Sequence, residues 1–364
     1  MKAVILAGGF GTRLRPLSFT RPKLLFPVGN RPLLDWKLER LAKSGIKEVI
    51  LAVNYMAEAF SQRYGDSAYG MKLFYSKEEK PLGTGGPIKN AEQIIGRKES
   101  FLVLNGDILT NLDYSKLVKE HREKDATATI ALCQVEDPSR YGVAELTEKN
   151  RIVQFVEKPS WEKAPSNLIN AGVYVLEPKI FDCIPSGQSV SIERKVFPKL
   201  ADEGKLYGYP FEGLWIDIGK LEDYLKANKL VLDIEIKNTQ LGKDTHLESG
   251  VKIRDPIVVG EKVVIGEKSE IGPYVAVGER VILGKEVHAQ NSVIFSGTVI
   301  SDFTTVKGAV IGENVTIGRR VKIGEGCMIG DHAVIRDNVT LARDVTVCPS
   351  REVAESVLTP KCLM

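Results

Sequence analysis

The chain has 364 residues, of which 43% are hydrophobic and 27% charged, and its formal net charge at pH 7 is +3. The length predicts two domains, since one domain usually takes roughly 100 to 200 residues. No basic block interleaved with aromatic residues is present, so we expect no nucleic-acid partner. No apolar stretch approaches the roughly 20 residues of a membrane span, so we expect no membrane partner.

The first residues and the cysteines bear on the compartment. The start, MKAVILAGGFGTRLRP, passes at once from a short apolar run to glycines and arginines, which is typical of a strand and loop rather than of a signal peptide. The five cysteines are odd in number and widely spread, which argues against a disulfide framework and against a zinc site. We therefore predict a cytoplasmic protein.

Strand-like and helical runs alternate over roughly the first 230 residues. In chain order we expect a strand at 2–6, a helix at 33–44 and a strand at 48–53. Further along we expect a strand at 101–104, a helix at 114–124 and a strand at 128–132. This alternation predicts an α/β layer fold with a largely parallel central sheet. Ligands of such sheets bind beyond the carboxyl ends of the strands, where the glycine-rich loop after Leu6 and the NGD at 105–107 fall.

From about residue 241 the pattern changes to a six-residue period, which predicts a parallel β-helix of hexapeptide repeats. Three short strands make one coil, so the stretch gives about six coils. One apolar side chain per strand points inward, and glycine takes the conformations that corners require. The period slips near residues 303–308. The expected inward series is Leu241, Leu247, Ile253, Val259, Ile265, Ile271, Val277, Leu283, Ala289 and Phe295, then Ile311, Ile317, Ile323, Ile329, Ile335, Leu341 and Val347.

The glycine-rich segment after the first strand carries the strongest chemical signal. It reads LAGGFGTRLRPL at 6–17, with RPK at 21–23 beyond it. Its glycines let backbone N–H groups approach a triphosphate, and Arg13 and Lys23 add fixed positive charge. The segment is not a Walker A loop, because no Gly-Lys-Ser/Thr ends it. It is not a dinucleotide fingerprint either, because Leu14 stands in place of the third glycine.

This segment resembles the signature of the sugar-1-phosphate nucleotidyltransferases. The likeness continues through NGD at 105–107, YGV at 141–143, FVEKP at 155–159, NAG at 170–172 and WIDIG at 215–219. Further blocks are similar to the mannose-1-phosphate guanylyltransferase branch of catalytic-subunit type: EKPLGTGGP at 79–87, VEDPSRYG at 135–142, SIERKVFP at 191–198 and the hexapeptide tail. The chain departs from relatives at Gly85 and Gly106, where Ala and Ser are frequent, and both changes keep a small residue.

The resemblance implies the fold and the reaction. The expected fold is a Rossmann-like nucleotidyltransferase domain at 1–236 followed by a left-handed β-helix at 237–364, and the handedness comes from the resemblance alone. The implied reaction is attack by a sugar 1-phosphate oxygen on the α-phosphorus of a nucleoside triphosphate, with release of pyrophosphate. GTP and mannose 1-phosphate are the favoured substrates. A homo-oligomer, alone or with a regulatory paralogue, is expected.

The resemblance also implies the roles of individual residues. Asp107 and Asp217 would hold Mg²⁺, an ion that takes one or two carboxylates beside substrate phosphates. The catalytic cations would be Arg13, Lys23 and Lys158. The predicted nucleotide-binding residues are Leu6, Ala7, Gly8, Gly9, Gly11, Thr12, Arg13, Lys23, Gly83 and Asp107. The predicted sugar-binding residues are Gly142, Glu157, Lys158, Asn170 and Gly172.

Three alternatives stay open at this point. The same fold could use UTP or dTTP with glucose 1-phosphate, because the phosphate-binding parts are shared across the family. The β-helix could be an acyltransferase, since His246, His288 and His332 lie in the repeats. The chain could instead be a non-catalytic regulatory subunit that binds a nucleotide sugar, although such relatives typically lose the basic residues or the carboxylates that this chain keeps.

Overall fold

The computed structural model describes residues 1–363, which form two compact units. The first unit contains residues 1–9 and 34–217, and the second contains residues 10–33 together with the chain from Ile218 onward. The predicted domain boundary at residue 236 rests on the change in sequence pattern, and it stays a prediction. No helix among the described residues has the length and apolar character needed to cross a bilayer.

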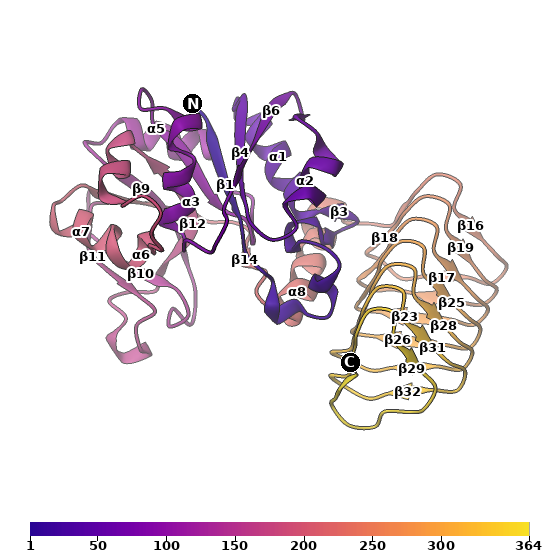
Figure 1. Ribbon diagram of the computed structural model, residues 1–364. Helices are drawn as coiled ribbons and strands as arrows, with labels where there is room; N and C mark the ends of the chain where they lie inside the picture. The colour runs from indigo at the N-terminus through magenta and orange to yellow at the C-terminus, as the bar shows by residue number, and fades with distance from the viewer. Residues whose placement is uncertain (364) are drawn as a thin grey trace. The chain divides into compact units, whose positions relative to one another are not determined.

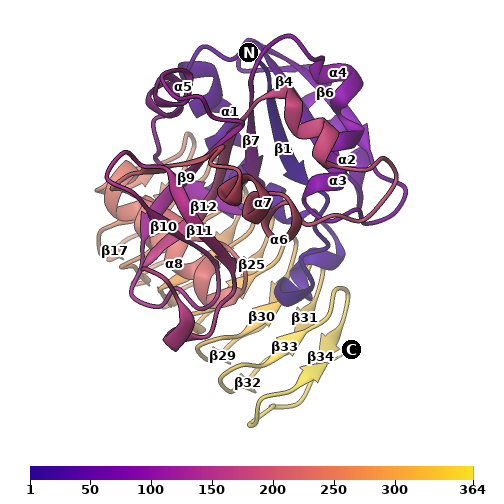
Figure 2. The same ribbon diagram turned by 90° about the vertical axis from the view of Figure 1, so that its left-hand side faces the viewer.

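A ten-stranded sheet forms the centre of the first unit (Figure 2). Its strands are β1 (Ala3–Ala7), β4 (Glu48–Val53), β5 (Ser67–Ala68), β6 (Met71–Lys77), β7 (Phe101–Asn105), β9 (Ala128–Gln134), β10 (Gly142–Leu146), β11 (Ile152–Glu157), β12 (Leu168–Leu176) and β13 (Leu206–Pro210). Strands β7, β1, β4 and β6 are neighbours in this order and run parallel. The expected strand at 48–53 is β4, and the other expected strands are β1, β7 and β9 with ends shifted by one or two residues.

The sheet is mixed beyond this parallel part. β12 pairs antiparallel with β7 and with β9, and β10 and β11 extend it further in antiparallel pairing. β13 returns to parallel pairing on β9. The α/β class is confirmed, and β1 and β4 have the almost continuous apolar sequences of strands covered on both faces.

Helices cover the sheet and supply the core. They are α1 (Leu33–Lys43), α2 (Ala57–Tyr64), α3 (Gly85–Asn90), α4 (Glu92–Ile95), α5 (Tyr114–Arg122), α6 (Ile192–Lys195) and α7 (Phe197–Asp202), with 3-10 turns η4 (Trp161–Lys163) and η5 (Pro178–Cys183). On one face Val4 and Val103 belong to a buried apolar cluster with Ile88 of α3 and Phe197 of α7. α5 begins where expected because Asp113 caps it, accepting from the Ser115 amide at 2.9 Å.

In the second unit, residues 10–33 pack with the helix α8 (Leu221–Val231) and the π-helical turn η6 (Leu232–Ile236) that follows. The segment contains the 3-10 turns η1 (Thr12–Leu14), η2 (Leu17–Phe19) and η3 (Lys23–Leu25) and the short strands β2 (Pro27–Val28) and β3 (Arg31–Pro32). The Gly29 amide donates to Asn228 Oδ1 at 2.9 Å, and the Tyr224 hydroxyl donates to the Pro27 carbonyl. The segment that carries Arg13 and Lys23 is therefore structurally tied to α8.

The C-terminal repeats form three parallel sheets of eight, seven and six short strands (Figure 1). The first contains β15 (Gln240–Leu241), β18 (Ile257–Val259), β21 (Val275–Val277), β24 (Ser292–Ile294), β27 (Val310–Ile311), β30 (Met328–Ile329), β33 (Thr346–Val347) and β35 (Cys362–Leu363). The second contains β16 (His246–Leu247), β19 (Val264–Ile265), β22 (Ile282–Leu283), β25 (Val299–Ile300), β28 (Thr316–Ile317), β31 (Val334–Ile335) and β34 (Glu352–Val353). The third contains β17 (Lys252–Ile253), β20 (Glu270–Ile271), β23 (His288–Gln290), β26 (Thr305–Lys307), β29 (Lys322–Ile323) and β32 (Thr340–Leu341). The parallel β-helix is confirmed, and its left-handedness stays a prediction.

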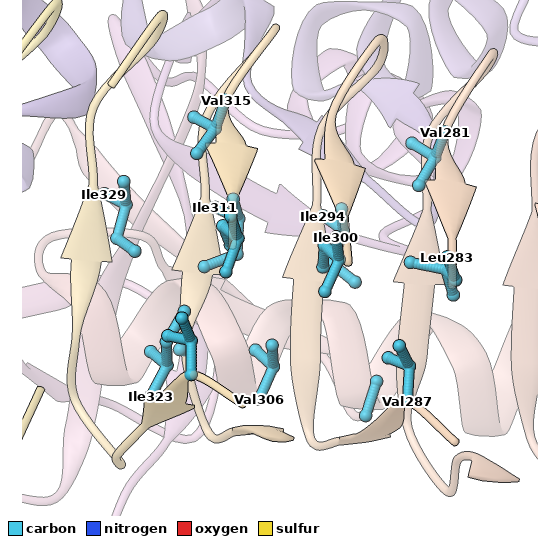
Figure 3. Close-up of a cluster of buried hydrophobic side chains, with 14 of the residues drawn as sticks. Val281, Leu283, Val287, Ile294, Ile300, Val306, Ile311, Val315, Ile323 and Ile329 are labelled. Carbon is cyan, nitrogen blue, oxygen red and sulfur yellow. The ribbon is translucent and has the colours of Figure 1, made fainter. Parts of the chain in front are cut away.

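The buried interior differs from the expected series at Phe295, and also at Leu241 and Leu247 of the first coil, which are exposed. Ile294 enters the apolar interior with Leu283 and Ile300, as Figure 3 shows, because the interval from Ala289 to Ile294 is five residues and not six. The neighbouring residue of a strand points the other way, so Phe295 leaves the interior of the β-helix. Phe295 is nevertheless only 1% exposed, because the ring of Phe26 lies 6.2 Å from it, edge to face.

Glycine also has a different role in the repeats from the one expected. Most left-handed corner positions are taken by other residues, such as Lys262, Arg280 and Asn314, with φ between 52° and 57°. The repeating glycines instead lie where one coil touches the next: a Cβ on Gly266 would be 2.5 Å from the Gly284 carbonyl carbon. The repeat selects glycine for space rather than for backbone conformation.

Gly266→Ala should therefore lower the free energy of unfolding by about 2 kcal/mol, because the added methyl group forces two coils apart. Urea unfolding followed by circular dichroism measures this. Ser301→Ala is the matched control, since Ser301 follows Ile300 as Gly266 follows Ile265 and already carries a Cβ. An unchanged midpoint for Gly266→Ala would contradict the packing argument.

Candidate active site

The glycine-rich loop leaves the sheet between two strand ends of the first unit. Leu6 at the end of β1 pairs with Asn105 of β7, and the Gly106 amide donates to the Leu6 carbonyl at 3.0 Å. A Cβ on Gly8 would lie 3.3 Å from Glu78 Oε1 and 3.4 Å from Asn54 Cβ, so two side chains pack closely against this glycine. Gly9 has open space around its Cα. The carboxyl edge of the sheet, where ligands of this fold bind, thus holds four of the predicted nucleotide-binding residues: Leu6, Ala7, Gly8 and Gly9.

Glu78 is a buried carboxylate that the sequence did not single out. It follows β6, is 5% exposed, and its Oε2 accepts from the Leu82 amide at 3.1 Å. Burial raises the pKa of Glu78, and the bond from Leu82 acts in the opposite direction. Its other oxygen faces Gly8. A buried acceptor therefore lies beside the predicted nucleotide loop.

The segment 82–86, which includes the first residues of α3, is fixed by Val190. The Val190 amide donates to the Leu82 carbonyl at 2.9 Å, and the Gly85 amide donates to the Val190 carbonyl at 2.8 Å. Gly83 has φ of 74°, and a Cβ there would come within 2.5 Å of the Val190 carbonyl oxygen. Gly83 is thus required both for its backbone conformation and for the close approach.

The two predicted metal ligands lie in or next to one strand pair. Asp107 is separated from the end of β7 by Gly106 and directly precedes β8 (Ile108–Thr110), and Asp217 ends β14 (Trp215–Asp217). β8 and β14 pair antiparallel with Asp217 opposite Ile108, so the register brings Asp217 beside the residue that follows Asp107. Both aspartates are half-buried. Lys37 of α1, which is 3% exposed, donates to the Ile108 carbonyl and so steadies this turn.

Gly142, Glu157 and Lys158 form one side of the predicted sugar site. Gly142 pairs with Glu157 across β10 and β11, and a Cβ on Gly142 would lie 2.8 Å from Glu157 Oε2. Burial raises the pKa of Glu157, and the nearby charge of Glu193 raises it further. Lys158 is largely exposed, with Nζ 3.7 Å from Glu157 Oε1. Its ammonium group is therefore available to an incoming anion.

Asn170 and Gly172 form the other side. Asn170 Oδ1 accepts from the Gly172 amide at 2.9 Å, and its Nδ2 donates to the Tyr174 hydroxyl at 3.0 Å. Gly172 has φ of 70°, and a Cβ there would be 2.8 Å from Asn105 Nδ2. Asn105 Oδ1 is buried and has no hydrogen-bond partner among residues 1–363. Asn105, two residues before Asp107, therefore lies next to the predicted sugar-binding residue Gly172.

Glu193 joins the 82–86 segment to strand β12, which carries the predicted sugar-binding residues. Its side chain is buried; Oε2 accepts from Thr84 Oγ1 at 2.6 Å and from Ser191 Oγ at 2.7 Å, while Oε1 accepts from the Tyr174 hydroxyl at 3.5 Å. Thr84 directly precedes α3 in the 82–86 segment, and the Tyr174 hydroxyl accepts from Asn170 Nδ2. Glu193 belongs to the SIERKVFP block of the sequence, but only the fold shows that its side chain bonds both Thr84 and Tyr174.

The second unit contains the remaining predicted nucleotide-binding residues, and contacts within that unit hold several of them. Gly11, with φ of 60°, accepts from Ser18 Oγ at 2.8 Å, and its Cβ position lies 3.5 Å from Lys23 Cβ. Lys23 is 9% exposed, whereas Thr12 and Arg13 are exposed. The Arg13 guanidinium lies beside Gly219, 3.3 Å from the Cβ position of that glycine.

The predicted site residues thus form two contiguous sets. Those of the first unit are Leu6, Ala7, Gly8, Gly9, Gly83, Asp107, Gly142, Glu157, Lys158, Asn170, Gly172 and Asp217. Those of the second are Gly11, Thr12, Arg13 and Lys23. The sequence missed Glu78, Asn105, Lys37 and Glu193 as site residues. The roles assigned to all of them stay predictions.

Two family models match almost the whole chain. Residues 2–234 match the nucleotidyl transferase family, and residues 253–363 match the GMPPB C-terminal domain. Mannose-1-phosphate guanyltransferase of Candida albicans is 39% identical over 263 residues, which cover 70% of this chain and 72% of that protein. Mannose-1-phosphate guanylyltransferase of Mycobacterium tuberculosis is 42% identical over 229 residues, covering 62% of this chain and 63% of that protein. The aligned part therefore spans less than two thirds of some relatives.

Solved structures match the first part of the chain. HddC from Yersinia pseudotuberculosis aligns with a TM-score of 0.54 and 33% identity, covering 63% of this chain and 98% of that one. UDP-glucose pyrophosphorylase from Acinetobacter baumannii aligns with a TM-score of 0.57 and 25% identity, covering 64% of this chain and 93% of that one. HddC has also been solved in complex with GMP-PN.

Proposed function

Because the chain belongs to the nucleotidyl transferase family, we propose that it transfers a guanylyl group from GTP to mannose 1-phosphate, forming GDP-mannose and pyrophosphate. The observation that carries the choice of GTP is the buried carboxylate of Glu78 beside Gly8. The mannose 1-phosphate acceptor is supported by the names of the Candida and Mycobacterium relatives.

Glu78 suits guanine through the pattern of its hydrogen bonds. The edge of guanine presents two adjacent donors, N1–H and N2–H, whereas uracil and thymine present one donor between two carbonyl acceptors. An ionised carboxylate only accepts and has about four lone-pair positions. Leu82 occupies one of them, so acceptor capacity is left for a base. Glu78 therefore favours guanine over the pyrimidines.

The proposed reaction brings two anions together. An oxygen of the sugar 1-phosphate attacks the α-phosphorus of GTP, the bond between the α- and β-phosphates breaks, and the electron pair leaves with pyrophosphate. Arg13 and Lys23 balance the charge that develops on the leaving pyrophosphate, and Lys158 binds the attacking phosphate. Catalysis is then chiefly orientation and charge neutralisation, with no covalent enzyme intermediate.

The family uses a divalent metal ion, and we propose Mg²⁺ with Asp107 and Asp217 as its protein ligands. The residues fit this ion because both carboxylates are half-buried and Asp217 lies opposite Ile108, the residue after Asp107, and one or two hard oxygen donors are what Mg²⁺ takes from a protein beside phosphates. The bound ion supplies charge neutralisation at the phosphates. Lys37 donates to the carbonyl of Ile108, the residue after Asp107, and so helps to hold the backbone that carries the Asp107 carboxylate.

Two other properties belong to this proposal. We place the protein in the cytoplasm, supported by five cysteines without a disulfide among them in the described residues. We also expect a homo-oligomer, alone or with a regulatory paralogue, because the first coil exposes Leu241 and Leu247 by 45% and 37%. Acyl transfer by the β-helix has little support, since His246, His288 and His332 are all exposed.

Pyrophosphate release with each pairing of GTP, UTP or dTTP with mannose 1-phosphate or glucose 1-phosphate tests the proposed function. We expect the GTP and mannose 1-phosphate pair to give the highest kcat/KM. A higher value for a pyrimidine nucleotide with glucose 1-phosphate would overturn the substrate assignment. Absence of pyrophosphate release with every pair would favour the regulatory subunit.

Arg13→Ala and Lys23→Ala should each weaken the use of the triphosphate. Losing one charge-assisted bond costs about 2 kcal/mol, which corresponds to a rise of roughly thirtyfold in the KM for GTP. Initial rates with each substrate varied in turn measure the effect, and Arg280→Ala, an exposed arginine of the β-helix, is the control. If only the KM for the sugar phosphate rose, the assignment of Arg13 and Lys23 to the triphosphate would be wrong.

A further inference from the structure

The side chain of Arg21, two residues before Lys23, is held by three successive coils of the β-helix. Arg21 Nη1 donates to Glu313 Oε1 at 2.8 Å, and Nη2 donates to Asp331 Oδ2 at 2.7 Å. The guanidinium lies over the Phe295 ring, 4.9 Å from its centroid. Phe295, Glu313 and Asp331 follow the neighbouring strands β24, β27 and β30 at the same corner of the β-helix.

The pair of Arg21 with Asp331 is buried, unlike the pair of Arg336 with Glu352, whereas the side chain of Glu313 is 39% exposed. The side chains of Arg21 and Asp331 are 14% and 4% exposed. Asp331 also accepts from Thr20 Oγ1 at 2.7 Å and from the Glu313 amide at 2.7 Å, so its carboxylate is fixed from several sides. By comparison, the side chains of Arg336 and Glu352 are 60% and 54% exposed. Solvent screens the second pair far more than the first.

The chain between Arg21 and Phe26 transmits this anchoring to Lys23. Pro22 restricts φ to −61°, and the Leu25 amide donates to the Pro22 carbonyl at 2.9 Å. The Phe26 amide donates to the Lys23 carbonyl at 3.0 Å, and the Phe26 ring packs on Phe295. Lys23 therefore lies in a short hydrogen-bonded turn that the β-helix holds at both ends.

We propose that Arg21 is a positioning residue, through which Asp331 and Glu313 of the β-helix hold Lys23 in place for the triphosphate. This inference rests on the proposed function, in which Lys23 binds the leaving phosphates. The C-terminal repeats then contribute to turnover without touching a substrate, since a cation misplaced by about 1 Å loses much of its effect on the transition state.

Steady-state kinetics of Asp331→Asn and Glu313→Gln test the proposal. We expect the KM for GTP to rise roughly tenfold or more and the KM for mannose 1-phosphate to stay within about twofold. Arg21→Lys should recover part of the loss seen in Arg21→Ala, because it keeps the charge but not the two-pronged guanidinium. Glu352→Gln, which removes one partner of the exposed pair, is the matched control and should leave both KM values unchanged.

A purely structural role would lower the melting temperature of these variants and leave the ratio of the two KM values at the wild-type value, and that result would overturn the proposal. Hydrogen exchange at residues 20–26 gives a readout that does not depend on activity. We expect faster exchange there in Asp331→Asn than in the wild type and in Glu352→Gln. If the wild type released no pyrophosphate with any substrate pair, the proposed function would fail, while unchanged exchange in Asp331→Asn would overturn the positioning role by itself.

Discussion

Asp217→Asn and Asp107→Asn should each lower kcat at least about 100-fold, because each removes a proposed ligand of the metal ion, and the positive charge of that ion should stabilise the transition state by about 3 kcal/mol. Asp217 lies in β14 opposite Ile108 of β8, the residue after Asp107, so in the proposed site each substitution should weaken binding of the same ion. Asparagine is nearly isosteric with aspartate, and the fold should survive the exchange. Pyrophosphate release at saturating GTP and mannose 1-phosphate measures the effect.

The control for this pair is Asp113→Asn, which changes a carboxylate outside the site. Asp113 caps α5, and asparagine caps helices as well as aspartate does, so activity and stability should stay at the wild-type level. Titration of the protein with Mn²⁺, followed by electron paramagnetic resonance, should show weaker binding in both site variants. Wild-type rates in both variants, or full activity of the wild type in excess chelator, would remove the metal assignment.

The sequence predicted those features that depend on local pattern. The apolar runs of β1 and β4 and the capped helix α5 were located within one or two residues, because burial on both faces and an aspartate cap leave a local signature. The motif blocks predicted Gly142 and Glu157 as sugar-binding residues, and the structure pairs these two residues across β10 and β11; it also places Asp217 opposite the residue that follows Asp107, while the roles of all four stay predictions. Gly142 and Glu157 lie at neighbouring strand ends of the ten-stranded sheet, whereas Asp217 lies in the separate two-stranded sheet of β8 and β14.

The features that the sequence did not predict depend on contacts between distant segments. The five-residue interval before Ile294 turned Phe295 outward, and a single shift of register is not visible in a repeat where Val, Ile and Phe are equally apolar. Glu78 and Lys37 look like surface charges in the sequence, since charged residues are seldom fully buried. Arg21 looked like part of a phosphate-binding motif, but its partners Glu313 and Asp331 lie about 300 residues away and no local pattern connects them.

Glu78→Gln should convert a guanine-selective site into one that no longer prefers GTP. The amide can keep its bond to the Leu82 amide through oxygen, and it then presents N–H groups where guanine also presents donors. Such a mismatch in a buried site leaves donors unpaired, so kcat/KM for GTP should fall about 100-fold. The values for UTP and dTTP should stay constant or rise, since both bases offer carbonyl acceptors.

A pH profile gives a second and independent readout for Glu78. Burial raises its pKa, so on acidification Glu78 takes up its proton at a higher pH than an ordinary glutamate does. The protonated carboxyl presents a donor to guanine, and the KM for GTP should therefore rise as the pH falls, beginning above the usual range of glutamate titration. Glu78→Gln has no proton to gain there, and its KM for GTP should lack this rise.

Glu79→Gln is the matched control, because Glu79 is the exposed neighbour of Glu78 and carries the same charge. It should keep the selectivity for GTP and the pH profile of the wild type, which separates the local hydrogen bond from a general loss of negative charge. An equal fall of kcat/KM for all three nucleotides in Glu78→Gln would mean that Glu78 only holds the Leu82 loop. An unchanged preference for GTP would mean that other residues recognise guanine, and Glu78 would then no longer support GTP as the substrate.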